Sequence, residues 1–208
     1  MLTNKQLRML ELLCGQIKNC VRCGLYSPGG RCRPFYTPAS KYVIVGEAPG
    51  AVEVKQNKPF SGQAGNILWE TIYNNKLKLI DFAVINSVNC RPVDSHYRNM
   101  KPTLDQAKAC NQWVRKFIKV IEPEKVLILG NYAMSTMLNR ISGIVQFNAL
   151  EGSLKEYNNT PYVLSVHPAY AIYNKTEGQK RLNEAIKKFA ETKRHVQIEL
   201  FDDKLFEI

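Results

Sequence analysis

One stretch of the chain, residues 41–65, limits the fold more than any other. It opens with a short apolar run over 42–45, which is typical of a buried strand. The run ends at Gly46 and leads into a turn-rich loop that carries a carboxylate, Glu47. Ligands of open α/β sheets bind beyond the carboxyl ends of the strands, so this loop is where we expect a functional site.

Three more apolar runs predict three more strands, at 82–85, 125–129 and 162–166. Segments with helical spacing separate these runs, and the polar stretch 148–161 is typical of turns. Strands that alternate with helices predict a parallel sheet covered on both faces. The expected fold class is therefore α/β, a three-layer α/β/α sandwich with a central four-stranded parallel sheet.

The chain has 208 residues, which suits one domain with its own core. We expect a single domain made of a helix and cysteine pair (1–40), an α/β core (41–194) and a tail (195–208). No run of about 18 apolar residues and no signal-peptide pattern is present, so we expect a cytoplasmic protein, and we expect it to be a monomer.

The net charge of +11 predicts an acidic partner, most often nucleic acid. The chain contains neither the G-x-x-x-x-G-K-S/T pattern nor the G-x-G-x-x-G pattern. Nucleotide hydrolysis and dinucleotide binding therefore lose their main support.

Six cysteines are present, and two of them form a C-x-x-C pair, Cys20 and Cys23. In a reducing compartment, metal or cluster ligation is favoured over structural disulfides. A closed site needs two further thiolates, for which Cys90 and Cys110 are the candidates. Helical spacing around Cys110 predicts that it faces inward. We assign no ligand role to the other two cysteines.

Three spaced motifs resemble those of the family 4 uracil-DNA glycosylases. The first is GEAPG at 46–50 followed by PF-x-G-x-AG at 59–65. The second is INSVNCRPV at 85–93, in which Asn89 replaces the lysine of the family's N-x-x-K-C-R-P. The third begins at His167 and resembles HPS, with Ala169 in place of the serine. The order of the four candidate cysteines also resembles the family's cluster-binding pattern.

This resemblance implies a DNA repair enzyme that hydrolyses the N-glycosidic bond of deoxyuridine in DNA, releases uracil and leaves an abasic site. It implies that Glu47 and His167 are catalytic, and that uracil is bound by Gly46, Phe60 and Asn86. Phe60 would stack on the extruded base, and the amide of Asn86 would match the donor and acceptor of uracil. His167 would stabilise the departing uracil anion, and Glu47 the positively charged sugar or the attacking water.

The resemblance also implies a cofactor, a 4Fe–4S cluster held by Cys20, Cys23, Cys90 and Cys110. A zinc site with four thiolate ligands would use the same residues. Glu53 is a second candidate for the catalytic carboxylate, and its alternative is a surface charge.

Nineteen residues separate Cys90 from Cys110, which is more than the family's usual spacing. The extra residues fall in a loop over 94–102. A related branch crosslinks to its DNA substrate through a histidine in an inserted loop, which makes His96 an alternative reactive residue. We expect instead a solvated loop that faces DNA. The other alternative is a non-catalytic Fe–S DNA-binding protein of the same fold.

Overall fold

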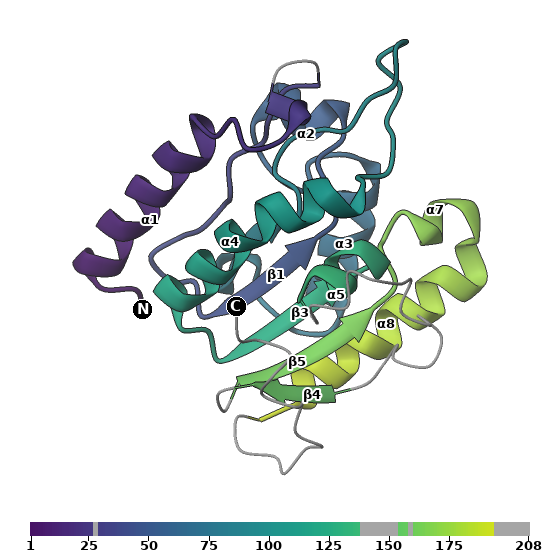
Figure 1. Ribbon diagram of the computed structural model, residues 1–208. Coiled ribbons are helices and arrows are strands. Elements are labelled where there is room, and N and C mark those ends of the chain that lie inside the picture. The colour runs from purple at the N-terminus through teal and green to yellow at the C-terminus, as the bar shows by residue number, and fades with distance from the viewer. Residues whose placement is uncertain (27–28, 138–153, 158–159, 194–208) are drawn as a thin grey trace.

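A computed structural model describes residues 1–26, 29–137, 154–157 and 160–193, which are coloured in Figure 1. The tail expected over 195–208 lies outside the described residues. Within the described residues, no helix is long and apolar enough to cross a membrane.

The centre of the fold is a five-stranded sheet in the order β2-β1-β3-β5-β4. Four of its strands are parallel, as predicted: β1 (Tyr42–Gly46), β2 (Phe82–Asn86), β3 (Lys125–Leu129) and β5 (Thr160–Ser165). The fifth strand, β4 (Leu154–Tyr157), pairs antiparallel to β5 at the edge. It lies in the stretch predicted as turns. An edge strand pairs along one side only and need not be apolar, so its sequence carried little strand signal.

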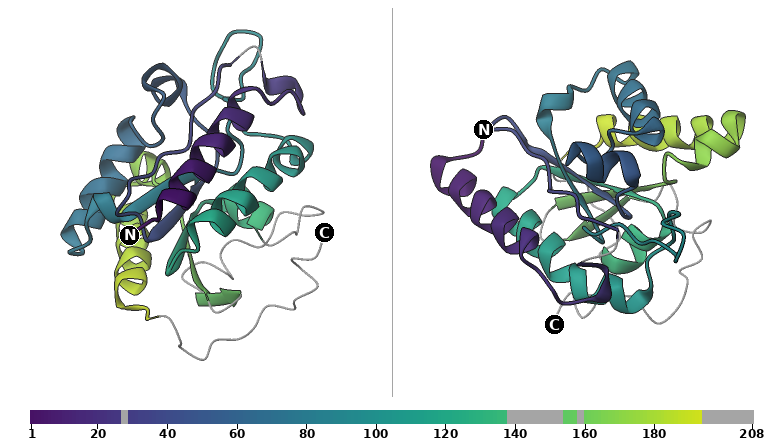
Figure 2. Two further views of the ribbon diagram at one scale, coloured as in Figure 1. Left: turned by 90° about the vertical axis from the view of Figure 1, so that its left-hand side faces the viewer. Right: turned by 90° about the horizontal axis from the view of Figure 1, so that it is seen from above.

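Helices cover both faces of the sheet, which confirms the three-layer α/β/α fold (Figure 2). One face is covered by α1 (Asn4–Lys18), α4 (Leu104–Ile121) and α5 (Asn131–Met137), and the other by α3 (Gln63–Asn74) and α8 (Lys175–Glu191). Two short helices, α2 (Ala51–Gln56) and α7 (Tyr170–Tyr173), and two 3-10 turns, Gly24–Tyr26 and Leu79–Asp81, complete the described elements.

Alternate residues of each central strand enter two separate apolar clusters. In β1, Val43 and Val45 pack toward α4, whereas Ile44 packs toward α3 and α8. All three side chains are fully buried. Burial on both faces explains why these strands are continuous apolar runs in the sequence.

Helix α1 packs on α4 and is fixed near both of its ends. Thr3 forms a capping box with Gln6, and the Gln6 amide donates to the carbonyl of Val120 at the end of α4 (2.9 Å). Near the other end of α1, the guanidinium of Arg31 donates to the carbonyl of Ile17 (2.9 Å). The first helix is thereby tied to the middle of the chain.

Candidate active site

A cleft of about 370 Å³ opens beyond the carboxyl ends of the parallel strands. Its lining contains four of the residues predicted for the site: Glu47, Phe60, Asn86 and His167. They lie in different segments, because Glu47 follows β1, Asn86 ends β2 and His167 follows β5. The shared edge of a parallel sheet gathers residues that are far apart in sequence.

Gly46 forms the floor beneath two of these side chains. It pairs with Asn86 across β1 and β2. A Cβ at Gly46 would overlap the Oδ1 atom of Asn86 and would lie 2.8 Å from the ring of Phe60. The side chain of Asn86 is 5% exposed, and its amide forms no hydrogen bond with the described residues. Glycine therefore leaves room for a buried amide whose donor and acceptor are free for a ligand.

Phe60 adopts an unusual backbone conformation, with a φ of 52°. The indole N–H of Trp69 donates to its carbonyl (2.9 Å), and a Cβ at Gly65 would collide with that carbonyl. A positive φ at a bulky residue persists only where its surroundings hold it, and such residues concentrate at functional sites. The ring of Phe60 lies 5.8 Å from the ring of His167, with the planes 32° apart.

The carboxylate of Glu47 is held by the segment that follows β3. Its Oε1 accepts a hydrogen bond from the N–H of Tyr132 in the first turn of α5 (3.0 Å). The same carboxylate packs against Gly130, which has a φ of +92° and at which a Cβ would lie 2.8 Å from the Glu47 Cδ. The carbonyl of Glu47 accepts from the hydroxyl of Ser87 (2.7 Å). Both the backbone and the side chain of Glu47 are thus positioned.

The protonation of His167 follows from one contact. The N–H of Ala169 donates to its Nδ1 (3.2 Å), so the proton of a neutral ring resides on Nε2. Burial lowers the pKa of His167, while the carboxylates of Glu47 and Glu53 act in the opposite direction. The ring is neutral near pH 7 and offers Nε2–H as a donor.

Glu53 is neither a free surface charge nor an unpaired carboxylate. Its two oxygens accept from the N–H groups of Gly50 (3.1 Å) and Gly62 (2.8 Å). It thereby joins the loop after β1 to the loop that holds Phe60, and it lines the cleft between them. The signal for part of this role is the offset of three residues from Gly50 to Glu53, which is that of a capping box.

The loop 94–102 reaches the cleft through its second arm. Asn99, Met100, Lys101 and Pro102 line the cleft, which the sequence analysis did not foresee. His96 is exposed and is absent from the cleft lining. Its Nδ1 lies 3.3 Å from the hydroxyl of Ser95.

The four predicted cysteine ligands lie on the α4 side of the sheet. Cys90 and Cys110 are buried in the α4-side core, and Cys20 and Cys23 pack against that core. Burial, with smaller contributions from the other three cysteines, raises the pKa of Cys110 to about 12, while a hydrogen bond from the backbone of Asn89 acts in the opposite direction. Within the described part of the chain, no three His, Cys, Asp or Glu side chains form a group ready to hold a metal ion.

Hydrogen-bond donors are directed at two of these sulfur atoms, those of Cys90 and Cys110. Arg31 donates from Nε to the Sγ of Cys90 (3.4 Å) and from Nη2 to the carbonyl of Cys20 (2.6 Å). The N–H of Asn89 donates to Cys110, and the buried Nδ2 of Asn89 has no partner among the described residues. Free thiols with donors directed at sulfur fit a group held by four thiolates. No sequence signal indicated the role of Arg31.

The family model of the uracil DNA glycosylase superfamily matches residues 33–190. The chain belongs to this superfamily. A type-4 uracil-DNA glycosylase of Sulfurisphaera tokodaii is 30% identical over 190 residues, which cover 88% of this chain and 84% of that protein. A type-4 uracil-DNA glycosylase of Thermotoga maritima is 27% identical over 84% of this chain and 88% of its own length. A type-4 uracil-DNA glycosylase of Archaeoglobus fulgidus is 26% identical over 93% of this chain and 98% of its own length.

The match to the uracil DNA glycosylase superfamily confirms the resemblance drawn from the three motifs. The matched residues include every residue predicted for the cleft, together with Cys90 and Cys110. Cys20 and Cys23 precede the matched region. The whole cleft lining therefore lies within the region that matches the superfamily.

Proposed function

We propose that this protein is a DNA repair glycosylase that hydrolyses the N-glycosidic bond of deoxyuridine in DNA. It releases uracil and leaves an abasic site, without a lyase step. The relatives at 26–30% identity are type-4 uracil-DNA glycosylases. The observation that carries the proposal is the buried amide of Asn86, which has no hydrogen-bond partner among the described residues, in a cleft that also holds Phe60 and His167.

The Asn86 amide gives the cleft a means of selecting the base. Uracil presents an acceptor at O4 and a donor at N3–H, which complement the donor and acceptor of an amide. Cytosine presents the opposite pattern at these positions. Phe60 stacks on the extruded ring, and stacking of this kind contributes about 1–3 kcal/mol per base.

His167 acts on the leaving group. As the C1′–N1 bond breaks, its electron pair moves onto uracil and negative charge builds on the base. The neutral imidazole donates from Nε2 to the uracil oxygen, because Nδ1 already accepts from the N–H of Ala169. A preorganised donor of this kind contributes about 10²–10³ in rate.

Glu47 acts on the sugar. Its carboxylate faces positive charge that develops at C1′ and orients the water whose oxygen forms the new C1′–O bond. The proton lost by that water leaves to solvent, and the uracil anion is the product released. The hydrogen bond from Tyr132 fixes the carboxylate before substrate binds, so little reorganisation is needed during the reaction.

We further propose that Cys20, Cys23, Cys90 and Cys110 hold a 4Fe–4S cluster, with a four-thiolate zinc site as the alternative. When bound, this group supplies a structural crosslink between the segment after α1 and the start of α4. The reaction in the cleft proceeds without it as a participant. Iron and acid-labile sulfide in stoichiometric amounts support the cluster, and zinc alone contradicts it.

The test of the function uses an end-labelled oligonucleotide with one uracil. After incubation with the protein, we expect strand cleavage only on alkali treatment, which reports an abasic site. His167→Ala should slow the reaction by about 10²–10³. The matched control, His96→Ala, should retain the wild-type rate, because His96 lies outside the cleft lining.

Two outcomes contradict the proposal. A band that migrates slowly and resists denaturation, and that His96→Ala abolishes, indicates covalent capture of DNA. Uracil DNA that is bound but never converted by the wild-type protein indicates a non-catalytic binding protein.

A further inference from the structure

The loop between β2 and α4 is an ordered hairpin, which stands out from the body of the molecule at the upper right of Figure 1. An antiparallel bridge joins Val93 to Asn99 at its base. The N–H of Met100 donates to the carbonyl of Pro92 (2.9 Å). The two arms are therefore paired as in a short β-ribbon, although the tip is in solvent.

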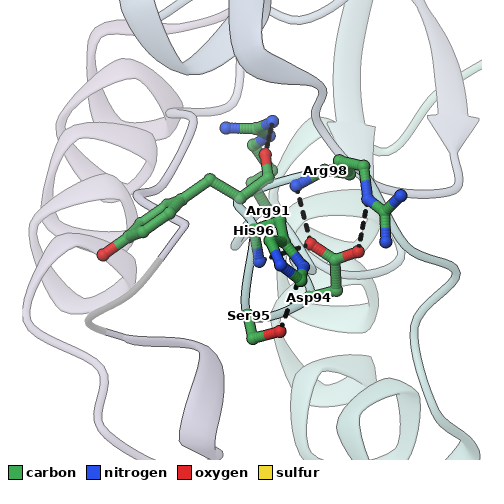
Figure 3. A network of polar contacts seen from close by, with 6 residues as sticks. Arg91, Asp94, Ser95, His96 and Arg98 are labelled. Atoms are coloured by element: carbon green, nitrogen blue, oxygen red, sulfur yellow. Dashed lines mark hydrogen bonds and ion pairs between the residues drawn. The ribbon is translucent and has the colours of Figure 1, made fainter.

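Asp94 fixes the turn of this hairpin. Its Oδ1 accepts from the N–H groups of His96 and Arg98 (both 2.9 Å), and its Oδ2 accepts from Nε of Arg98 (2.7 Å), as Figure 3 shows. The hydrogen bonds from Arg98 and His96 also hold the pKa of Asp94 below its usual value. An exposed loop closed by so many contacts is preorganised.

Arg91 braces the second arm from the side of the protein core. Its Nε donates to Oδ1 of Asn99 (2.6 Å), and its Nη2 donates to the carbonyl of Tyr97 (2.8 Å). The contacts to Asn99 and Tyr97 fix the direction in which the next residue leaves the hairpin. That residue is Met100.

Met100 lines the cleft but remains 55% exposed. The neighbouring Lys101 also lines the cleft and is exposed. Tyr173, which is 87% exposed, and the half-exposed Val52 are other apolar residues of the cleft lining. The mouth of a polar site thus carries large apolar side chains that the protein leaves uncovered, next to a cation.

A glycosylase that acts on a duplex must first remove the target base from the stack, at a cost of a few kcal/mol. Proteins that unstack DNA insert an apolar side chain such as Met, Leu or Phe between base steps. Such a side chain must be exposed, must lie close to the pocket that takes the base, and must be carried by a backbone rigid enough to hold it between the base steps. Met100 meets all three requirements.

We propose that the hairpin 94–102 is a duplex-opening element, in which Met100 enters the base stack beside the extruded deoxyuridine and Lys101 contacts a neighbouring phosphate. This inference rests on the proposed glycosylase function. The hairpin acts on base-paired DNA, because a single strand has no paired stack to open. The cleft residues act on both kinds of substrate.

The test compares single-turnover uracil excision from a duplex and from the same strand unpaired. Met100→Ala should lower the duplex-to-single-strand rate ratio about tenfold, since unstacking is no longer supported. Asp94→Ala should lower this ratio in the same direction by releasing the turn. The matched control is Met9→Ala, because Met9 is another exposed methionine, 42% exposed on α1.

A second readout is binding of duplex DNA with 2-aminopurine beside the uracil, measured in the His167→Ala background. Fluorescence should rise as the stack opens, and Met100→Ala should remove most of that rise. An unchanged rate ratio or an unchanged fluorescence rise overturns the duplex-opening role. Failure of the wild-type protein to excise uracil from either substrate overturns the proposed function instead, so the two failures are distinguishable.

Discussion

The cleft and the cysteine site differ in how their polar groups are satisfied. In the cleft, Glu47, Glu53 and His167 each accept from backbone N–H groups of neighbouring loops or helix ends. At the cysteine site, burial raises the pKa of Cys90 and Cys110, and only the donors on Arg31 and Asn89 favour the thiolates.

This difference separates a site whose side chains are held by the polypeptide from one whose thiols suit the cluster proposed above. Fixed backbone dipoles hold the carboxylates of Glu47 and Glu53 in the cleft. Burial favours the protonated thiols of Cys90 and Cys110, so binding of the proposed cluster would release protons and contribute to the stability of the fold. Disruption of the cleft should therefore leave iron binding unchanged, whereas disruption of the cysteine site should lower the stability of the whole fold.

The largest effect is expected from removal of a cysteine ligand. Cys110→Ala should abolish iron binding and lower the free energy of unfolding by several kcal/mol, on the order expected for loss of a structural metal crosslink. Iron analysis and urea unfolding measure the two effects. The control is Cys14→Ala, since Cys14 is also buried but is not assigned as a ligand. Equal iron loss in both variants would refute the assigned ligand set.

An intermediate effect is expected in the cleft from Gly46→Ala. The new methyl group would overlap the Asn86 amide and press on the Phe60 ring, and overpacking of this kind costs about 1–3 kcal/mol. Excision should fall roughly ten- to a hundredfold at unchanged iron content. Single-turnover kinetics measure the excision rate, and iron analysis of the same sample measures the iron content.

The matched control for this variant is Gly15→Ala in the interior of α1. A Cβ at Gly15 meets no atom within 4 Å, so the helix should gain about 0.5–1 kcal/mol and excision should not change. If Gly46→Ala excises uracil at the wild-type rate, the floor of the uracil pocket is elsewhere.

The smallest expected effect is the contribution of His167 to the pH dependence of the free energy of unfolding. Its pKa is lowered in the folded protein, whereas the unfolded chain takes up the proton near pH 6.5. Between these two pKa values the unfolded state binds more protons, so stability falls as the pH drops below about 6.5. For one proton the slope is at most about 1.4 kcal/mol per pH unit.

Urea unfolding of the wild type and of His167→Gln at pH 7.5, 6.5 and 5.5 measures this contribution. We expect the wild type to lose more stability than the variant toward pH 5.5. The same loss in both proteins would mean that other groups account for the acid sensitivity.

Much of the fold was predictable because parallel strands buried on both faces appear in the sequence as apolar runs. Glu47, Asn86 and His167 follow or end such runs, so their gathering at one edge followed from topology alone. The roles of these residues and the set of four cysteine ligands came instead from the resemblance to a family, and no spacing argument supplied them.

Contacts formed only by tertiary structure could not be predicted. Glu53 joins the N–H groups of Gly50 and Gly62, and the second of these is nine residues away in another loop. Arg31 contacts both Cys20 and Cys90, between which the whole of β1, β2 and their connection lies in the sequence. Strand β4 escaped prediction because an edge strand needs no apolar periodicity.

The attachment of α1 at two places has a consequence for local unfolding. Gln6 ties its first turn to the end of α4, and Arg31 ties its last turn to the segment that carries the cysteines. While both ties hold, the amides of α1 should exchange with solvent only through global unfolding. If the proposed cluster is lost, Cys20 and Cys23 no longer fix the segment that Arg31 holds, so this end of the helix should open before the rest of the fold. Amide exchange in α1 would then report the fraction of the protein that carries the proposed cluster.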